Sequence, residues 1–133
     1  MRTVVVGASG GIGAALAAAL EQRGDDVRRL GRRSAPALDL LDEASIAAAA
    51  VAVGPGLDLV IDATGLLHDA QMQPEKSLRQ VDPVQMARSF AINATGPALL
   101  MKHFLPLLAA DRRAVFATLS ARVGRIADNS LGG

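Results

Sequence analysis

The fold follows from the stretch Met1-Arg2-Thr3-Val4-Val5-Val6-Gly7-Ala8-Ser9-Gly10-Gly11-Ile12-Gly13. In it an apolar run ends in a glycine-rich turn, and an alanine-rich helical pattern follows. A strand, a glycine loop and a helix in this order are typical of dinucleotide binding. The glycines permit the tight turn, let backbone N–H groups approach a pyrophosphate and let the helix pack closely on the strand. The helix N-terminus then offers its amides to the phosphate charge. An ordinary tight turn is the alternative.

Length and composition indicate one small α/β domain. The chain has 133 residues, of which 50% are hydrophobic and only 2% aromatic. The core must therefore consist of Ala, Val, Leu and Ile, which suits helices packed closely on a sheet. We expect a single domain over residues 1–133.

Charge and cysteine content exclude several classes of site. The 14 basic and 13 acidic residues give a net charge of +1, which provides no electrostatic footprint for nucleic acid or a membrane surface. Without cysteine there are no disulfides and no thiolate ligands, and we expect no metal site. No apolar segment approaches the roughly 20 residues that span a bilayer. We expect a soluble cytoplasmic protein.

Hydrophobic periodicity and capping signals outline alternating strands and helices. Asp42 and Asp82 stand where helix N-caps belong, and Pro83 follows at a first helical position. The alternation predicts a parallel, doubly wound α/β sheet, in which ligands bind beyond the carboxyl ends of the strands. We expect strands over 3–6, 26–30, 57–63 and 114–119 with a short additional strand over 37–40, and helices over 11–23, 44–53 and 83–108.

Basic residues follow the second expected strand, at the place where a dinucleotide site contacts the adenosine ribose. An Asp or Glu there would select the free 2′-hydroxyl of NAD, but the sequence has Arg32 and Arg33. Guanidinium groups suit a phosphate, so we expect NADPH to be preferred, with NAD still open. Ser34 adds a hydroxyl donor. A solvated basic turn is the alternative.

The glycine spacing resembles the short-chain dehydrogenase/reductases. Gly7, Gly11 and Gly13 match the TGxxxGxG motif of that family, with Val6 in place of its threonine. Gly7, Gly10 and Gly13 also match the GxxGxxG spacing of its extended and atypical branches. The resemblance implies a Rossmann-type sheet with strand order 3-2-1-4-5, incomplete on its C-terminal side. It also implies cofactor contacts by Gly7, Ser9, Gly10, Gly11, Ile12 and Gly13.

Two further segments resemble cofactor-binding motifs of the same family. Asp39-Leu40 is similar to the Asp-Val or Asp-Leu pair that holds the adenine edge, although an exposed turn is the alternative. Asp62-Ala63-Thr64-Gly65 stands where the family has Asn-Asn-Ala-Gly, which implies cofactor contacts by Ala63, Thr64 and Gly65. Asp62 departs from the motif, because a carboxylate only accepts hydrogen bonds. Leu66-Leu67-His68-Asp69 is similar to the classical carbonyl-reductase branch, and His68 is expected to be a loop histidine.

Asn93 and Ser120 are the candidate catalytic residues. Pro97 has no N–H to donate to the Asn93 carbonyl, so a helix that continues through it should kink there. In the family, the main-chain carbonyl of an asparagine at such a kink holds a water in a proton relay; the alternative is a helix–helix hydrogen bond by the side chain. Ser120 stands where the family's catalytic serine follows the fifth strand and binds the substrate carbonyl, although turn chemistry alone could explain a serine there.

The proton donor in the family's reaction is a tyrosine in a Tyr-x-x-x-Lys motif, and the chain has no tyrosine. Its lysines, Lys76 and Lys102, lie upstream of Ser120, so the resemblance covers the N-terminal half of a usual member. Pro74–Leu78 and Leu119–Arg122 are similar to sniffer-like carbonyl reductases of the classical branch. The resemblance implies an NADPH-dependent oxidoreductase acting on a carbonyl or alcohol, with the chain itself inactive and any homo-oligomer formed through helix 83–108. A non-catalytic nucleotide-binding module and an extended or atypical epimerase are the alternatives.

Overall fold

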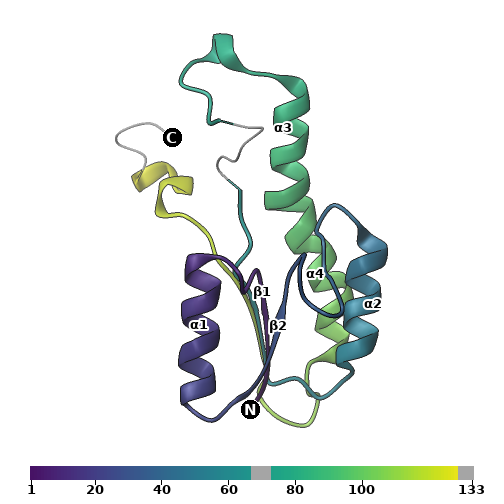
Figure 1. Cartoon of the computed structure of the whole chain (residues 1–133). Helices are drawn as coiled ribbons and strands as arrows, with labels where there is room; N and C mark the ends of the chain where they lie inside the picture. The colour runs from purple at the N-terminus through teal and green to yellow at the C-terminus, as the bar shows by residue number, and fades with distance from the viewer. Residues whose placement is uncertain (67–72, 129–133) are drawn as a thin grey trace.

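The computed structural model describes residues 1–66 and 73–128, which form a parallel sheet between two layers of helices (Figure 1). The sheet order is β2-β1-β3-β4, and every pair is parallel. Its strands are β1 (Arg2–Val6), β2 (Asp26–Leu30), β3 (Leu59–Asp62) and β4 (Val115–Thr118). The predicted parallel, doubly wound sheet is confirmed.

Two apolar clusters hold the layers together, one on each face of the sheet. Side chains of a strand alternate between the faces, and β1 accordingly gives Val4 and Val6 to one cluster and Val5 to the other. Helix α1 (Gly11–Gln22) covers the face of Val5, whereas α2 (Glu43–Val53) and α4 (Gly96–Phe104) cover the opposite face (Figure 1).

The expected short strand over 37–40 is wrong. The Leu38 N–H donates to the Gly31 carbonyl at 2.9 Å, and the Asp39 N–H donates to the Ser45 hydroxyl at 2.9 Å. These local bonds use the backbone groups that a strand would pair with a neighbour, so the segment folds back as a loop. Without it, the remaining strands keep the predicted order.

The expected helix over 83–108 consists of several shorter pieces. It begins as α3 (Pro83–Phe90), passes through a π-helical segment over Ala91–Thr95, continues as α4, and ends in a 3-10 turn over Leu105–Leu107. Pro106 cannot donate to the carbonyl one turn earlier, which explains the early end of α4. The remaining short 3-10 turns cover Leu78–Gln80, Arg122–Gly124 and Ile126–Asp128.

Charged groups secure the N-terminal edge of the sheet, opposite the carboxyl ends of its strands. The Asp58 carboxylate accepts from the backbone N–H of Arg2 at 2.7 Å and from Arg112 Nε at 2.6 Å. Its pKa is lowered, mainly by the Arg112 hydrogen bond and then by the Arg2 backbone N–H. The contact ties the starts of β1, β3 and β4 together.

Within the described ranges, no helix combines the length and the apolar character that a bilayer span requires.

Candidate functional site

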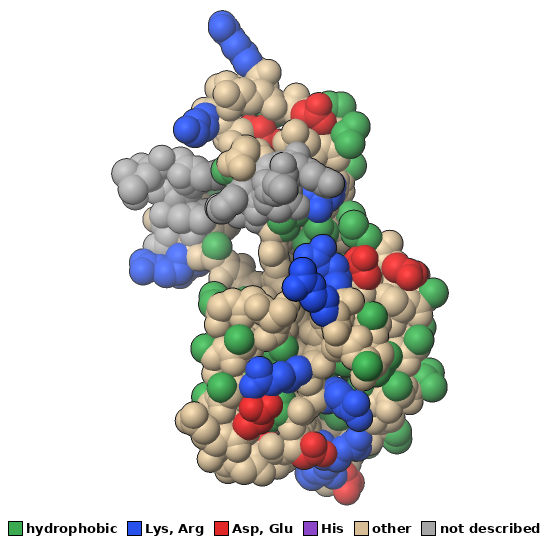
Figure 2. Space-filling view, viewed as in Figure 1, with side chains coloured by type: hydrophobic (Ala, Val, Ile, Leu, Met, Phe, Trp, Pro, Cys, Tyr) green, Lys and Arg blue, Asp and Glu red, His purple; other side chains and the backbone are tan. Residues whose placement is uncertain are grey.

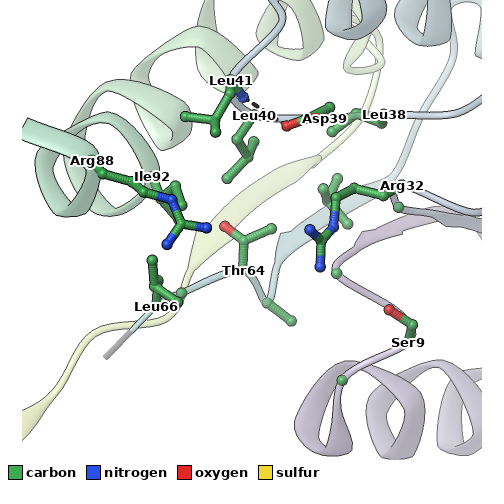
Figure 3. A pocket seen from close by; sticks show the side chains of 16 residues that line it. Ser9, Arg32, Leu38, Asp39, Leu40, Leu41, Thr64, Leu66, Arg88 and Ile92 are labelled. Atoms are coloured by element: carbon green, nitrogen blue, oxygen red, sulfur yellow. Dashed lines mark hydrogen bonds between the residues drawn. The ribbon is translucent and has the colours of Figure 1, made fainter. Parts of the chain in front are cut away.

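A cavity of about 330 Å³ opens at the carboxyl ends of β1, β2 and β3 (Figure 3). The loops after these strands form its floor and one wall, and residues of α3 and the π-helical segment form the other wall. Its lining is Val6, Gly7, Ser9, Gly10, Gly31, Arg32, Leu38, Asp39, Leu40, Leu41, Ala63, Thr64, Gly65, Leu66, Arg88 and Ile92. The cavity thus lies where parallel α/β sheets bind ligands.

The glycines of the loop after β1 serve different purposes. Gly7 has a φ of +80°, and a Cβ on it would lie 2.9 Å from the Ala63 carbonyl oxygen. A Cβ on Gly13 would lie 2.2 Å from the Gly7 carbonyl oxygen. The fold therefore requires glycine at both positions. A Cβ on Gly10 would approach an atom of the protein only to 3.5 Å, and one on Gly11 would meet nothing within 4 Å, so their missing side chains leave space for a ligand.

The N-terminus of α1 is free of side-chain caps and acidic residues. Gly10 occupies the N-cap position, and the described part of the chain supplies no side-chain hydrogen bond to it. The helical ladder begins with the Ala14 N–H, which donates to the Gly10 carbonyl at 2.8 Å. The amides of the first turn are thus available to an anion. Ser9 and Gly10 line the cavity, whereas Gly11, Ile12 and Gly13 do not, and Ile12 is 65% exposed.

The basic turn after β2 sends one arginine into the cavity. Arg32 lines it, and its guanidinium points inward (Figure 3). Arg33 is exposed and lies outside the lining. The Ser34 hydroxyl is used within the turn, because it accepts from the Gly31 N–H at 3.0 Å and lies 2.6 Å from the Pro36 carbonyl oxygen. Lys and Arg side chains gather on this face where the sheet meets the segment that carries α3 (Figure 2).

Asp39 and Leu40 both lie in the cavity wall. The Asp39 carboxylate accepts from the Leu41 N–H at 2.9 Å, which fixes its orientation. Leu40 packs against Gly96, where an added Cβ would lie 2.9 Å from Leu40 Cδ1. Glycine at 96 thus lets the helix pass close to the Asp39-Leu40 loop.

Asp62 lies beneath the cavity and is only 1% exposed. Its Oδ1 accepts from the Thr64 N–H at 3.0 Å and from the Thr64 hydroxyl, and its Oδ2 accepts from the Thr118 hydroxyl at 2.9 Å. A carboxylate suits this place because all three partners can donate. Asp62 therefore ties β3 to β4 and also holds the loop that carries Thr64.

Asn93 anchors the other end of that loop through its side chain. Its Oδ1 accepts from the Leu66 N–H at 2.8 Å, and its Nδ2 donates to the Leu66 carbonyl at 2.6 Å. The regular α-helix is interrupted around Asn93 by the π-helical segment, in which the Gly96 N–H donates to the Ala91 carbonyl, and the kink at Asn93 stays a prediction. The side chain makes these contacts with a loop rather than with a second helix.

Ser120 and His68 complete the positions named from the sequence. Ser120 follows β4 at the same edge of the sheet as the cavity, but it is exposed and does not line it. His68 lies outside the described residues, as do Leu67 and Asp69. The cavity thus unites Gly7, Ser9, Gly10, Arg32, Asp39, Leu40, Ala63, Thr64 and Gly65, and it leaves Gly11, Ile12, Gly13, Arg33, Ser34, Asn93 and Ser120 outside its lining.

Sequence reasoning missed Arg88, which enters the cavity from α3. Ile92, four residues further on, lines the cavity beside it (Figure 3). Residues four apart share one side of a helix. No signal in the sequence singles out Arg88, because its place in the cavity depends on the tertiary packing that sets α3 beside it.

Comparison with protein families gives one match. The model of the NAD dependent epimerase/dehydratase family matches residues 3–86, which is more than half of the chain. No curated protein matches the sequence significantly.

Solved structures of short-chain dehydrogenases share the fold. A Burkholderia multivorans protein assigned as a short-chain alcohol dehydrogenase is 25% identical over 99% of this chain and 68% of its own, with a TM-score of 0.83. A carbonyl reductase from Pseudomonas aeruginosa PAO1 is 25% identical over 98% and 66%, with a TM-score of 0.81. A small-chain dehydrogenase in complex with NADPH is 26% identical over 94% and 52%, with a TM-score of 0.79. The chain spans about half to two thirds of the length of such structures.

Proposed function

The chain belongs to the NAD dependent epimerase/dehydratase family, and from this premise we propose that it is the cofactor-binding part of an NADPH-dependent reductase. The proposed reaction transfers a hydride between the cofactor and a carbonyl or alcohol substrate, as in the carbonyl reductases of the classical branch. The observation that carries the proposal is the entry of Arg32 into a cavity bordered by an uncapped helix N-terminus. NADPH, when bound, supplies the hydride.

The residues around the cavity fit the parts of this cofactor. The open positions Gly10 and Gly11 and the amides of the first turn of α1 suit the pyrophosphate. Arg32 suits the 2′-phosphate, because a guanidinium forms charge-assisted hydrogen bonds with phosphate oxygens. Asp39, Leu40 and the loop Ala63–Gly65 border the remaining length of the cavity, where we place the adenosine.

Ser120 and Asn93 have proposed roles in the transfer step. The Ser120 hydroxyl would donate to the substrate carbonyl oxygen, on which negative charge develops as the hydride arrives. The main-chain carbonyl of Asn93 cannot accept from Pro97, and we place the relay water on this carbonyl. The 133 residues contain no tyrosine, so the proton donor of the family motif is not among them.

Two other functions have an observation in their favour. A non-catalytic nucleotide-binding module would explain a cavity with this lining in a chain without tyrosine. An extended or atypical epimerase would agree with the family model and with the spacing of Gly7, Gly10 and Gly13. Both would bind a dinucleotide, so the first experiment addresses the cofactor.

The proposal is tested by titrating the chain with NADPH and with NADH by calorimetry. The charge-assisted hydrogen bonds of the Arg32 guanidinium with the 2′-phosphate, discounted for exposure, give an expected preference for NADPH of roughly ten- to hundredfold. Arg32→Ala should remove most of this preference, whereas Arg113→Ala, an exposed arginine before β4, should leave it intact. Equal affinities for NADPH and NADH in the unmutated chain would overturn the NADPH assignment.

A further inference from the structure

Arg88 faces Arg32 across the cavity. Both guanidinium groups point inward from opposite walls, with the Thr64 side chain between them (Figure 3). Arg32 comes from the loop after β2 and Arg88 from α3, so the two walls belong to different layers of the fold. Among the described lining residues, these are the only cationic side chains, and Asp39 is the only anionic one.

Hydrogen bonds before and after Arg88 stabilise the helical wall that carries it. The Asp82 carboxylate caps α3 by accepting from the N–H groups of Val84 and Gln85 at 2.9 and 3.0 Å. Beyond α3, the Asn93 side chain is bonded to the backbone of Leu66. The cap stabilises the helix itself, and the Asn93 contacts attach the helical wall to the loop after β3. Arg88 is therefore carried on an ordered element beside the cavity.

The chemistry between the two arginines suits an aromatic ring better than a compact ion. Leu40 and Ile92 add apolar surface to the same part of the cavity. A planar guanidinium stacks on an aromatic face and is weakly hydrated, so it loses little solvation when a ring covers it. Two planar cations together with apolar side chains can cover a purine and also attract the negative charge of its nucleotide.

We propose that Arg88 is a second nucleotide-binding arginine, whose guanidinium stacks on the adenine ring from the side of α3. This inference rests on the proposed function, because it places the adenosine of the cofactor between α3 and the loop after β2. It separates the roles of the two arginines. Arg32 contacts the 2′-phosphate and distinguishes NADPH from NADH, whereas Arg88 contacts the base that both cofactors share.

The test is the affinity of Arg88→Ala for NADPH, NADH, AMP and nicotinamide mononucleotide, measured by calorimetry. Loss of the stack should weaken NADPH, NADH and AMP by a similar factor, roughly three- to thirtyfold. Nicotinamide mononucleotide, which has no adenine, should bind as it does to the unmutated chain. Arg113→Ala removes the same charge outside the cavity and should change none of the four affinities.

Arg88→Lys keeps the charge and most of the side-chain length, so it tests the stack in a variant with little reason to misfold. A lysine lacks the guanidinium plane, and its losses should stay within about threefold of those of Arg88→Ala. Full binding by Arg88→Lys, or a loss in Arg88→Ala confined to NADPH, would overturn the stacking role. If the unmutated chain bound neither NADPH nor NADH, the proposed function itself would fail; normal binding by the unmutated chain and by both Arg88 variants would overturn this inference alone.

Discussion

Replacement of Asp62 tests how the floor of the cavity is held. In Asp62→Ala, three donors lose their acceptor: the Thr64 N–H, the Thr64 hydroxyl and the Thr118 hydroxyl. A hydrogen bond to a charged group contributes about 1.5–3 kcal/mol, but the burial of the carboxylate has already offset part of this gain. We expect the free energy of unfolding to fall by about 2–4 kcal/mol. Loss of packing is a small part, because few side-chain atoms are removed.

Asp62→Asn separates the acceptor role from the shape of the side chain. The amide oxygen can still accept from both donors of Thr64, and the amide nitrogen can donate to the Thr118 hydroxyl, which also accepts. The expected loss is therefore only about 1 kcal/mol. Thr118→Val removes one donor and keeps the side-chain volume, with an expected loss of about 1–2 kcal/mol. Urea unfolding followed by circular dichroism measures all three variants.

The double variant Asp62→Ala/Thr118→Val shows whether the two residues act through each other. Their losses should add to more than the loss of the double variant, because either change alone breaks the same hydrogen bond. Additive losses would refute the bond between β3 and β4. A loss below about 0.5 kcal/mol in Asp62→Ala would refute the whole argument, since that is the size of an ordinary surface substitution.

Three further outcomes follow from the structure. Gly13→Val should destabilise the fold by about 1–3 kcal/mol in thermal or urea unfolding, because the added side chain meets the Gly7 carbonyl. Gly11→Val should unfold like the unmutated chain but bind NADPH more weakly in calorimetry, because an added Cβ at Gly11 meets no atom of the protein within 4 Å. Asp58→Asn should lower the free energy of unfolding near neutral pH and leave it unchanged in acid. The pKa of Asp58 is lower in the folded chain than in the unfolded chain, so its carboxylate stabilises the fold above the unfolded-state pKa, and this gain is lost as the pH falls through the folded-state pKa. Urea unfolding at several pH values measures the effect, and an equal cost at all pH values would contradict it. No aldehyde or ketone should support an appreciable rate of NADPH oxidation by the 133-residue chain. Positioned proton transfer raises the rate of such reactions about 10²–10⁴-fold, and the chain has no tyrosine to provide it. Turnover close to that of an intact reductase in the same absorbance assay would contradict this.

The parts of the fold that follow from neighbouring residues could be predicted from the sequence. The strand, glycine loop and helix at the start, the caps by Asp42 and Asp82, and the interruption before Pro97 each depend on residues within one or two turns of each other. The loop over 37–40 could not be predicted in this way. Its apolar alternation resembles a strand, and only the bonds to Gly31 and Ser45 show that its backbone is used elsewhere.

The candidate site could likewise be predicted only where its residues depend on their neighbours in the sequence. The position of Arg32 after β2 was evident, because the strand and the glycine loop set its place along the chain. Its neighbour Ser34 looked equally available, but its hydroxyl is used to close the turn. Arg88 reaches the cavity only because the folded chain places α3 beside it. No local pattern contains that information.

The loop Thr64–Leu66 is the element that unites the floor and the wall of the cavity. Asp62 holds Thr64 at one end, and Asn93 holds Leu66 at the other. The family resemblance implies a role for the main-chain carbonyl of Asn93, but the Asn93 side chain also fixes a segment of the cavity lining. A change at Asn93 would therefore disturb the lining of the cavity as well as the proposed relay. Loss of activity in an Asn93 variant would not identify the relay unless cofactor affinity were measured in the same variant.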